Sequence, residues 1–308
     1  MASITVRAPA KVNLQLSVGR RRPDGYHDLV NVFQAVSLYD EVSAQPADDF
    51  SVSVSATAGG PDLAGVPQDA ENLAVRAARL LADHTGVADG VALRIRKAIP
   101  VAAGMAGGSA DAAAALLACD ALWQTHLRRE ELSALAAELG ADVPFALLGS
   151  TAVGYGRGDV LTPVLGRGQF QWVFALADEG LSTAAVYAEC DRLRTRDPGW
   201  VGALRDNVDP DLLAAVCSGD PAALGRLLTN DLTLAALSLR PALAATLATG
   251  PAHGTLGSIL CGSGPTCAFL VDSAEAALDL AVALTAMGLC RDVKRATGPV
   301  GGARLVTP

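Results

Sequence analysis

The chain has 308 residues, of which 51% are hydrophobic and 18% are charged, and it carries a net charge of −8. This composition provides enough apolar material for about two folded domains and excludes a largely disordered chain. The acidic balance argues against duplex DNA or an anionic membrane surface as the main partner, although a local pocket can still bind a small anion.

The first third of the chain is rich in alternating or β-branched residues, which predict strands. These strands, separated by breaks at proline, glycine and aspartate, are expected at 4–8, 13–18, 32–38, 41–45 and 51–56. Apolar residues at helical spacing followed by a glycine predict a helix over 71–86. The alternating stretch 91–96 then predicts another strand.

A glycine-rich stretch, 100–108, joins that strand directly to an alanine-rich helix that we expect to reach Trp123. Residues 128–140 predict a further helix, with Gly140 as its end. The boundary between two domains is expected near 158–168.

The second half mixes strands and helices. We expect a buried strand at 172–177, a helix from Ser182, short helices to about 249, two strands around the CGSG turn, a helix at 274–288 and closing strands at 290–297 and 303–308. Mixed runs, rather than strict alternation of strand and helix, predict an α+β fold.

Two features concern the location of the protein. The N-terminus lacks a signal-peptide pattern, and no run of about 18 apolar residues predicts a membrane span. The six cysteines are scattered without metal-ligand spacing, so a zinc site is not expected and the thiols are expected to be reduced and buried. We therefore expect a cytoplasmic protein.

The glycine-rich stretch is the first candidate site. Gly104, Gly107 and Gly108 precede Ser109 at the start of a helix, and they follow a strand. Glycine lets the backbone approach a phosphate closely, and unpaired N–H groups at a helix N-terminus attract an anion. The alternative is a plain glycine turn before a stable helix.

The second candidate site combines Lys11 and Asn13 with the turn RRRPDGYH. Lys11 lies among strand-forming residues and can point inward, while Tyr26 can stack on a ring and His27 can hydrogen bond to the edge of a ring. The alternatives are an exposed strand lysine and a surface histidine beside a turn.

Asp142 in LGADVPF is the third candidate. Gly140 and Pro144 fix its position, and a carboxylate on a rigid turn can accept a proton from a substrate hydroxyl. The alternative is an aspartate that caps the helix after Pro144.

These motifs together resemble those of the GHMP kinase superfamily, which includes galactokinase and the homoserine and mevalonate kinases. The resemblance runs nearly end to end and includes PAKVNLQL, DGYH, ENLAVRAARLL, IPVAAGMAGGSADAA, LGADVPF, NDL at 230–232 and CGSGPTCAF. The combination of DGYH with GADVP is similar to the branch that uses ATP to phosphorylate the 2-hydroxyl of a cytidine-diphosphate-linked methylerythritol in non-mevalonate isoprenoid synthesis.

The resemblance implies a fold of two α+β domains with the active site between them. Residues 1–162 would form an ATP-binding domain similar to the second domain of ribosomal protein S5. Residues 163–308 would form a ferredoxin-like domain that contributes to substrate binding.

The resemblance also implies a role for individual residues. Asp142 would accept the hydroxyl proton, with Lys11 as its charge partner. ATP would be bound by Asn72, Leu73, Lys97, Gly104, Met105, Ala106, Gly107, Gly108 and Ser109. The substrate would be bound by Asn13, Tyr26, His27, Asp142, Thr183 and Tyr187. Mg²⁺ would accompany ATP, with Ser109 as its protein contact.

One position departs from the pattern of the family, which usually has a glycine where this chain has Ala103. An alanine there needs a negative φ or costs about 1 kcal/mol, so we expect slightly weaker nucleotide binding.

The partner implied by the resemblance is a small molecule, with no nucleic acid and no membrane, and the protein would be a monomer or weak homodimer. The nearest alternative is a homoserine or mevalonate type of kinase, in which Tyr26 and His27 have no base to read. A catalytically inactive binding protein would be expected to lack Lys11, Asp142 or the glycine loop. A nucleic-acid binder conflicts with the net charge of −8.

Overall fold

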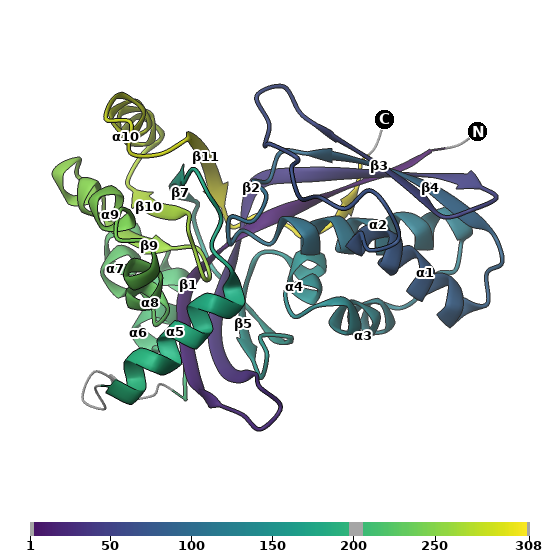
Figure 1. Cartoon of the computed structure of the whole chain (residues 1–308), viewed down its shortest axis with the longest axis horizontal. Coiled ribbons are helices and arrows are strands. Elements are labelled where there is room, and N and C mark those ends of the chain that lie inside the picture. Colours follow the sequence, from purple (N-terminus) through teal and green to yellow (C-terminus); the bar gives the residue numbers. More distant parts are fainter. Residues whose placement is uncertain (1–2, 197–205, 307–308) are drawn as a thin grey trace.

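The computed structural model describes residues 3–196 and 206–306. Within these ranges the chain forms an eight-stranded and a four-stranded sheet, each packed against helices (Figure 1). The mixture of largely antiparallel sheets and helices is the α+β architecture that the sequence predicts.

The larger sheet is built around two long strands that pair antiparallel. Its strands are β1 (Ile4–Arg21), β2 (His27–Ala47), β3 (Ser51–Ala56), β4 (Gly90–Lys97), β5 (Thr151–Tyr155), β6 (Val160–Val164), β8 (Thr229–Asn230) and β12 (Arg304–Leu305). The order along the main path is β12-β1-β2-β4-β3, with β5 attached to β2, β6 to β5 and β8 to β1.

The predicted breaks within the first two strands are wrong. The expected strands 4–8 and 13–18 are one strand, because the register shifts between Pro9 and Ala10 and this irregularity accommodates the proline. The expected strands 32–38 and 41–45 are likewise one strand, in which the buried carboxylate of Asp40 accepts hydrogen bonds from a neighbouring loop. The strands β5 and β6 had no counterpart in the prediction.

Four helices accompany the larger sheet: α1 (Leu73–Thr85), α2 (Gly107–Trp123), α3 (Arg129–Leu139) and α4 (Val143–Leu148). Asn72 caps the start of α1 and Gly86, with a φ of 73°, ends it, close to the predicted bounds. The buried alanines of α2 pack against α1, β1 and β2, where small side chains permit a close approach.

The second part of the molecule contains the four-stranded antiparallel sheet, in the order β11-β7-β10-β9. Its strands are β7 (Phe170–Leu176), β9 (Gly257–Leu260), β10 (Cys267–Val271) and β11 (Asp292–Gly298). Its helices are α5 (Thr183–Arg196), α6 (Pro210–Ser218), α7 (Pro221–Leu227), α8 (Thr233–Leu239), α9 (Leu243–Ala252) and α10 (Ala274–Ala286). The predicted strand at 172–177 is β7, whose Trp172 and Phe174 are fully buried.

The two parts are joined by more than one crossing of the chain. Both β8 and β12 come from the second half of the sequence, yet both pair with β1 in the larger sheet. The expected division between residues 162 and 163 falls inside β6 and stays a prediction. The expected closing strand 303–308 is reduced to Arg304–Leu305, and its last two residues lie outside the described ranges.

The described helices include none that is long and apolar enough to cross a membrane. Four of the six cysteines are buried as expected, whereas Cys217 is exposed and Cys290 half-buried, and all six are free thiols.

Candidate active site

Lys11 and Asn13 point into the molecule from β1. The Lys11 ammonium donates a hydrogen bond to Asn13 Oδ1 at 2.8 Å, and Asn13 Nδ2 donates to Asn31 Oδ1 at 2.9 Å. Asn13 Oδ1 also accepts a hydrogen bond of 2.9 Å from the backbone N–H of Gly262 in the CGSG turn. Lys11 is buried, so the alternative of an exposed strand lysine is wrong.

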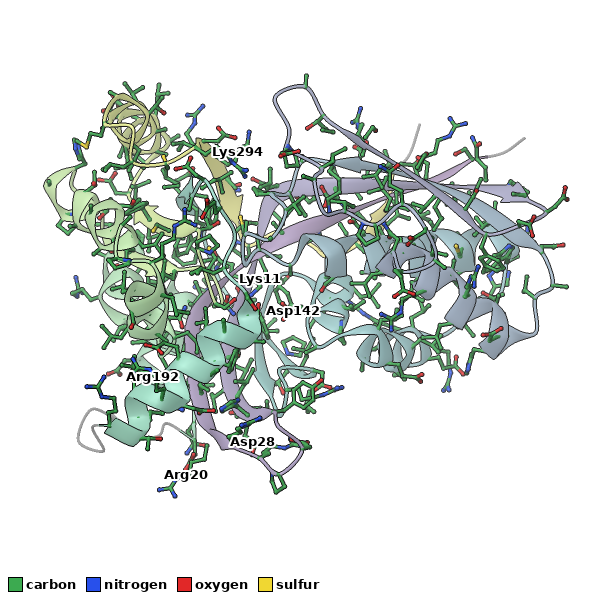
Figure 2. All side chains as sticks on the ribbon, in the orientation of Figure 1. Lys11, Arg20, Asp28, Asp142, Arg192 and Lys294 are labelled. Carbon is green, nitrogen blue, oxygen red and sulfur yellow. The ribbon has the colours of Figure 1, made fainter. Side chains whose placement is uncertain are left out.

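Asp142 faces this lysine from the start of α4 (Figure 2). Its Oδ2 lies 3.7 Å from Lys11 Nζ, and its side chain is 33% exposed whereas that of Lys11 is 6% exposed. Asp142 occupies the N-cap position of α4, but its side chain makes no capping hydrogen bond. The carboxylate is therefore positioned beside an ammonium without serving as a cap.

The glycine-rich loop meets both β1 and the CGSG turn. Gly104 has a φ of 73°, and a Cβ on it would lie 2.0 Å from the carbonyl oxygen of Cys261, so no other residue fits without a shift of the backbone. The backbone N–H of Lys11 donates to the Met105 carbonyl at 3.2 Å. Three motifs that are far apart in the sequence therefore meet at one point.

The start of α2 offers unpaired backbone donors. Its N-cap residue is Ala106, and no side chain caps the helix. Ser109 lies inside the first turn instead of at the cap. The N–H groups of this turn and the helix dipole together favour an anion.

Backbone strain in this loop lies at positions other than the one expected from the sequence. Ala103 does not have a positive φ, whereas Ala102 has a φ of 53° and Ala106 one of 60°. A left-handed conformation costs an alanine about 1–2 kcal/mol.

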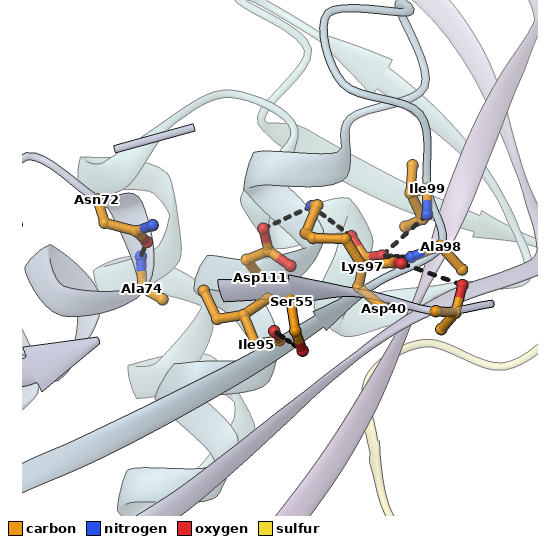
Figure 3. Close-up of polar contacts among 10 residues, drawn as sticks. Asp40, Ser55, Asn72, Ala74, Ile95, Lys97, Ala98, Ile99 and Asp111 are labelled. Carbon is orange, nitrogen blue, oxygen red and sulfur yellow. Dashed lines mark hydrogen bonds and ion pairs between the residues drawn. The ribbon is translucent and has the colours of Figure 1, made fainter. Parts of the chain in front are cut away.

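A cavity of about 400 Å³ lies beside the loop. All the predicted ATP-binding residues except Met105 and Ser109 line it, namely Asn72, Leu73, Lys97, Gly104, Ala106, Gly107 and Gly108. The Met105 side chain packs in the core instead. The Asn72 amide already has partners, since its Oδ1 accepts from Ala74 N at 2.9 Å (Figure 3) and its Nδ2 donates to Pro67 O at 2.7 Å.

Two aspartates that the sequence analysis did not single out surround Lys97 in this cavity wall (Figure 3). The Lys97 ammonium donates to Asp40 and, at 2.6 Å, to Asp111 Oδ2, and all three side chains are buried. Asp40 Oδ1 accepts from the N–H groups of Ala98 and Ile99 at 2.6 and 2.9 Å. We call Asp40, Lys97 and Asp111 the buried triad.

The two carboxylates of the buried triad differ in how well their oxygens are hydrogen-bonded. Asp111 Oδ1 has no hydrogen-bond partner among the described residues, although Asp111 lines the cavity. Burial raises the pKa of Asp111 well above its usual range, and the attraction of Lys97 offsets this only in part. Burial lowers the pKa of Lys97, but the two carboxylates outweigh it and the net shift is upward. A charged residue within an alanine-rich helix was the available signal for Asp111.

The residues expected to read a base lie around the start of β2 and along α5. Tyr26 is 59% exposed in the turn, whereas His27 is buried, so the alternative of a surface histidine is wrong. The His27 ring lies 5.1 Å from the Tyr187 ring, at an angle of 39°. His27 Nε2 lies 3.0 Å from Oδ1 of Asp191, a residue that the sequence analysis missed.

Helix α5 also touches the CGSG turn and approaches Asp142. Thr183 Oγ1 lies 3.0 Å from Ser263 Oγ in that turn. Burial raises the pKa of Tyr187, and the nearby Asp142 carboxylate raises it further. The residues expected to read a base therefore lie on the side of the CGSG turn that holds the Lys11–Asp142 pair.

Side chains alone do not form a metal centre here. Across residues 3–196 and 206–306 no group of three or more histidine, cysteine, aspartate or glutamate residues could hold a metal ion. A hard cation bound mainly through phosphates needs only one or two protein ligands, so this finding is compatible with Mg²⁺ bound through a nucleotide.

Comparison with known proteins assigns the class. A family model of the GHMP kinases N terminal domain matches residues 72–150, and a model of the GHMP kinases C terminal domain matches residues 212–288. A relative from Thermobifida fusca (strain YX) is 56% identical, with 99% of this chain and 98% of the relative covered. The chain therefore belongs to the GHMP kinase family. That relative is named 4-diphosphocytidyl-2-C-methyl-D-erythritol kinase.

Solved structures agree with this assignment. The crystal structure of a 4-(cytidine 5'-diphospho)-2C-methyl-D-erythritol kinase matches with a TM-score of 0.77 and 34% identity, covering 96% of this chain and all of that one. A homoserine kinase from Cytophaga hutchinsonii matches with a TM-score of 0.73 but 19% identity, which shows the fold alone. The predicted two-domain GHMP kinase fold is confirmed.

Proposed function

We propose that this kinase transfers the γ-phosphoryl group of ATP to the 2-hydroxyl of 4-diphosphocytidyl-2-C-methyl-D-erythritol. The observation that carries the proposal is that two groups of residues with different chemistry lie near α5. His27 and Tyr187, which suit a nucleobase, are linked through α5 to Lys11 and Asp142, which suit transfer to a hydroxyl. Thr183, one turn before Tyr187, contacts Ser263 in the CGSG turn, and the same turn binds Asn13, the partner of Lys11. The relative from T. fusca and the matched crystal structure have names that point to the same substrate.

In the proposed reaction Asp142 accepts the proton of the attacking hydroxyl. Its carboxylate is partly exposed and makes no capping bond, so a substrate hydroxyl can reach it. A weak base is sufficient when phosphoryl transfer is loose, because the proton can leave late. Lys11 holds a fixed positive charge 3.7 Å away, where it stabilises negative charge on the transferred group.

ATP would occupy the cavity beside the glycine-rich loop. The volume of about 400 Å³ lies in the range for small-molecule sites, and the uncapped first turn of α2 suits the phosphates. Mg²⁺ would neutralise phosphate charge, with the Ser109 hydroxyl in that turn as its proposed protein contact.

The substrate side of the site would use the remaining predicted residues. Asn13, held by three hydrogen bonds, would orient the diphosphate or the hydroxyl. Tyr26 and Tyr187 would stack on the base and His27 would read its edge, with Thr183 nearby. Such a substrate is a small water-soluble molecule, and we expect a cytoplasmic monomer or weak homodimer that needs neither membrane nor nucleic acid.

The test is ADP release with ATP and the proposed substrate, for the wild type and for Asp142→Asn. We expect wild-type turnover and a loss of about 10²–10⁴ in the variant. Asp83→Asn, which changes an exposed aspartate on α1, is the matched control and should turn over like the wild type. Wild-type turnover together with a fully active Asp142→Asn would refute the role of Asp142 as the proton acceptor. Activity on homoserine or mevalonate alone would refute the proposed substrate.

A further inference from the structure

Asp191 contacts a base-reading residue but has no assigned role. Its Oδ1 lies 3.0 Å from His27 Nε2, and its side chain is 30% exposed whereas the His27 side chain is 5% exposed. The other ring nitrogen, Nδ1, makes no hydrogen bond to any described residue. The buried imidazole is therefore held through Nε2, while Nδ1 keeps its hydrogen-bonding capacity unused among the described residues.

The position of Asp191 is set by the fold. It lies one turn of α5 after Tyr187 and two turns after Thr183, so all three share a face of the helix. Thr183 contacts the CGSG turn, and Arg194 donates hydrogen bonds of 2.9 and 2.7 Å to the carbonyls of Gly19 and Val18 in β1. Because α5 is fixed near both ends, the Asp191 carboxylate has a defined place beside His27.

A carboxylate can only accept a hydrogen bond, so His27 Nε2 must donate. In a neutral imidazole the proton then sits on Nε2, and Nδ1 becomes an acceptor. The two common pyrimidines differ at ring position 4, where cytosine has an amine that donates and uracil a carbonyl that accepts. An acceptor at Nδ1 pairs with the amine and leaves the carbonyl unsatisfied.

We propose that Asp191 is a positioning residue that fixes His27 as the tautomer with a free acceptor at Nδ1, and thereby selects a cytosine over a uracil nucleotide. This inference rests on the proposed function, and it adds the group that decides which base is accepted. A site built around a specific hydrogen bond rejects a mismatched ligand strongly, because the buried polar group is left unpaired.

The first experiment measures binding of CDP and UDP by calorimetry to the wild type, Asp191→Ala and Asp191→Asn. We expect the wild type to prefer CDP and Asp191→Ala to lose at least tenfold of that preference, because alanine cannot accept the proton of Nε2. Asp191→Asn keeps an oxygen that can accept this proton, so it should retain most of the preference for CDP. Asp28→Asn removes an exposed carboxylate next to His27 in sequence and is the matched control, which should keep the wild-type ratio. Equal weakening of both ligands, with an unchanged ratio, would mean a purely structural role and overturn the proposal.

The second experiment reads the tautomer without any ligand, from ¹⁵N NMR of the histidine rings. The chain has four histidines, so the His27 signals are identified by their loss in His27→Gln. We expect a protonated Nε2 and an unprotonated Nδ1 in the wild type, and a mixture of tautomers in Asp191→Ala. A wild-type proton on Nδ1, whether in the other tautomer or in an imidazolium, would contradict the inference.

The two experiments separate this inference from the proposed function. A wild type that binds CDP but whose preference does not depend on Asp191 refutes the inference alone. A wild type that binds neither CDP nor UDP refutes the proposed substrate and with it the selection of a base.

Discussion

Two lysines near the glycine-rich loop pair with carboxylates, and the two pairs differ in distance and in exposure to solvent. Lys97 lies between Asp40 and Asp111, buried and within 2.6 Å of the Asp111 carboxylate. Lys11 lies 3.7 Å from Asp142, whose side chain is one-third exposed. In the first arrangement the carboxylates are buried and only Asp111 Oδ1 lacks a hydrogen-bond partner among the described residues, whereas in the second the Asp142 carboxylate is accessible to another molecule.

This difference distinguishes an ion pair that stabilises the structure from an ion pair that a substrate can reach. A buried ion pair contributes little net stability, but the loss of one partner leaves a charge without compensation in the interior. The buried triad therefore behaves as a part of the scaffold that lies under the loop. A long, partly hydrated contact such as Lys11–Asp142 contributes little to stability and leaves both groups available to a substrate.

The largest expected effect on stability comes from removing the cation of the buried triad. Lys97→Met leaves two buried carboxylates without their cation, and we expect the free energy of unfolding to fall by about 3–5 kcal/mol. Urea unfolding measures this. Lys294→Met removes a lysine that pairs with Asp292 at 2.8 Å near the surface, and as a control it should cost less than about 1 kcal/mol. Similar losses in the two variants would contradict the distinction.

Removing Lys11 from its pair with Asp142 should lower turnover more than it lowers the stability of the fold. Lys11→Met removes the charge beside Asp142, and we expect turnover to fall by about 10²–10⁴. The free energy of unfolding should fall by only about 1 kcal/mol, because Asn13 Oδ1 keeps its bond from Gly262 and Asp142 stays hydrated. ADP release and urea unfolding on the same preparation test both parts, and a loss above about 3 kcal/mol would place Lys11 with the scaffold.

The loop that touches both lysines should respond to relief of its strain. Ala106 has a φ of 60°, so Ala106→Gly should raise the free energy of unfolding by about 0.5–1 kcal/mol and tighten ATP binding slightly. Ala103→Gly is the matched control, because Ala103 lacks a positive φ and the added chain entropy should lower stability slightly. Thermal unfolding with and without ATP compares them. The opposite order of stabilities would place the strain at Ala103.

An effect that depends on pH is expected at Glu189, whose carboxylate pairs with Arg192 away from both lysines. Hydrogen bonds from Arg192 and Ser238, each of 2.6 Å, lower the pKa of Glu189 to about 2. Because the unfolded chain binds this proton more readily, the stabilisation is present above about pH 4.5 and is lost as the pH falls toward 2. Glu189→Gln should be less stable than the wild type by about 1 kcal/mol at pH 6, and the gap should narrow at pH 3. A stability difference between the wild type and Glu189→Gln that is the same at both pH values would contradict a lowered pKa of Glu189 as its cause.

Much of the fold followed from local patterns. The helix after Asn72 and the helix after Gly107 were placed closely, because caps, glycines and apolar spacing act within a few residues. The merging of the early strands was missed, because the chain around Pro9 and Asp40 is stabilised by contacts distant in sequence. For the same reason nothing local indicates that β8 and β12 return to β1.

The candidate site was predictable to the extent that its chemistry lies in short motifs. Lys11, Asp142 and the glycines stand out as candidates in this way, and the resemblance to a family supplies their expected roles and extends the set. The partner of His27 is not predicted from the sequence, since its contact with Asp191 joins residues 164 positions apart. Such pairs become visible only when the packing of α5 against the first strands is known.

The contact of Gly104 with Cys261 also bears on when the protein becomes active during its synthesis. A nascent chain that has released the glycine-rich loop from the ribosome still lacks the turn on which this loop rests, and it lacks the donor that fixes Asn13. The proposed active site is therefore assembled only after most of the second half has emerged and folded. Fragments that end before residue 261 should remain inert, however well their first helices form.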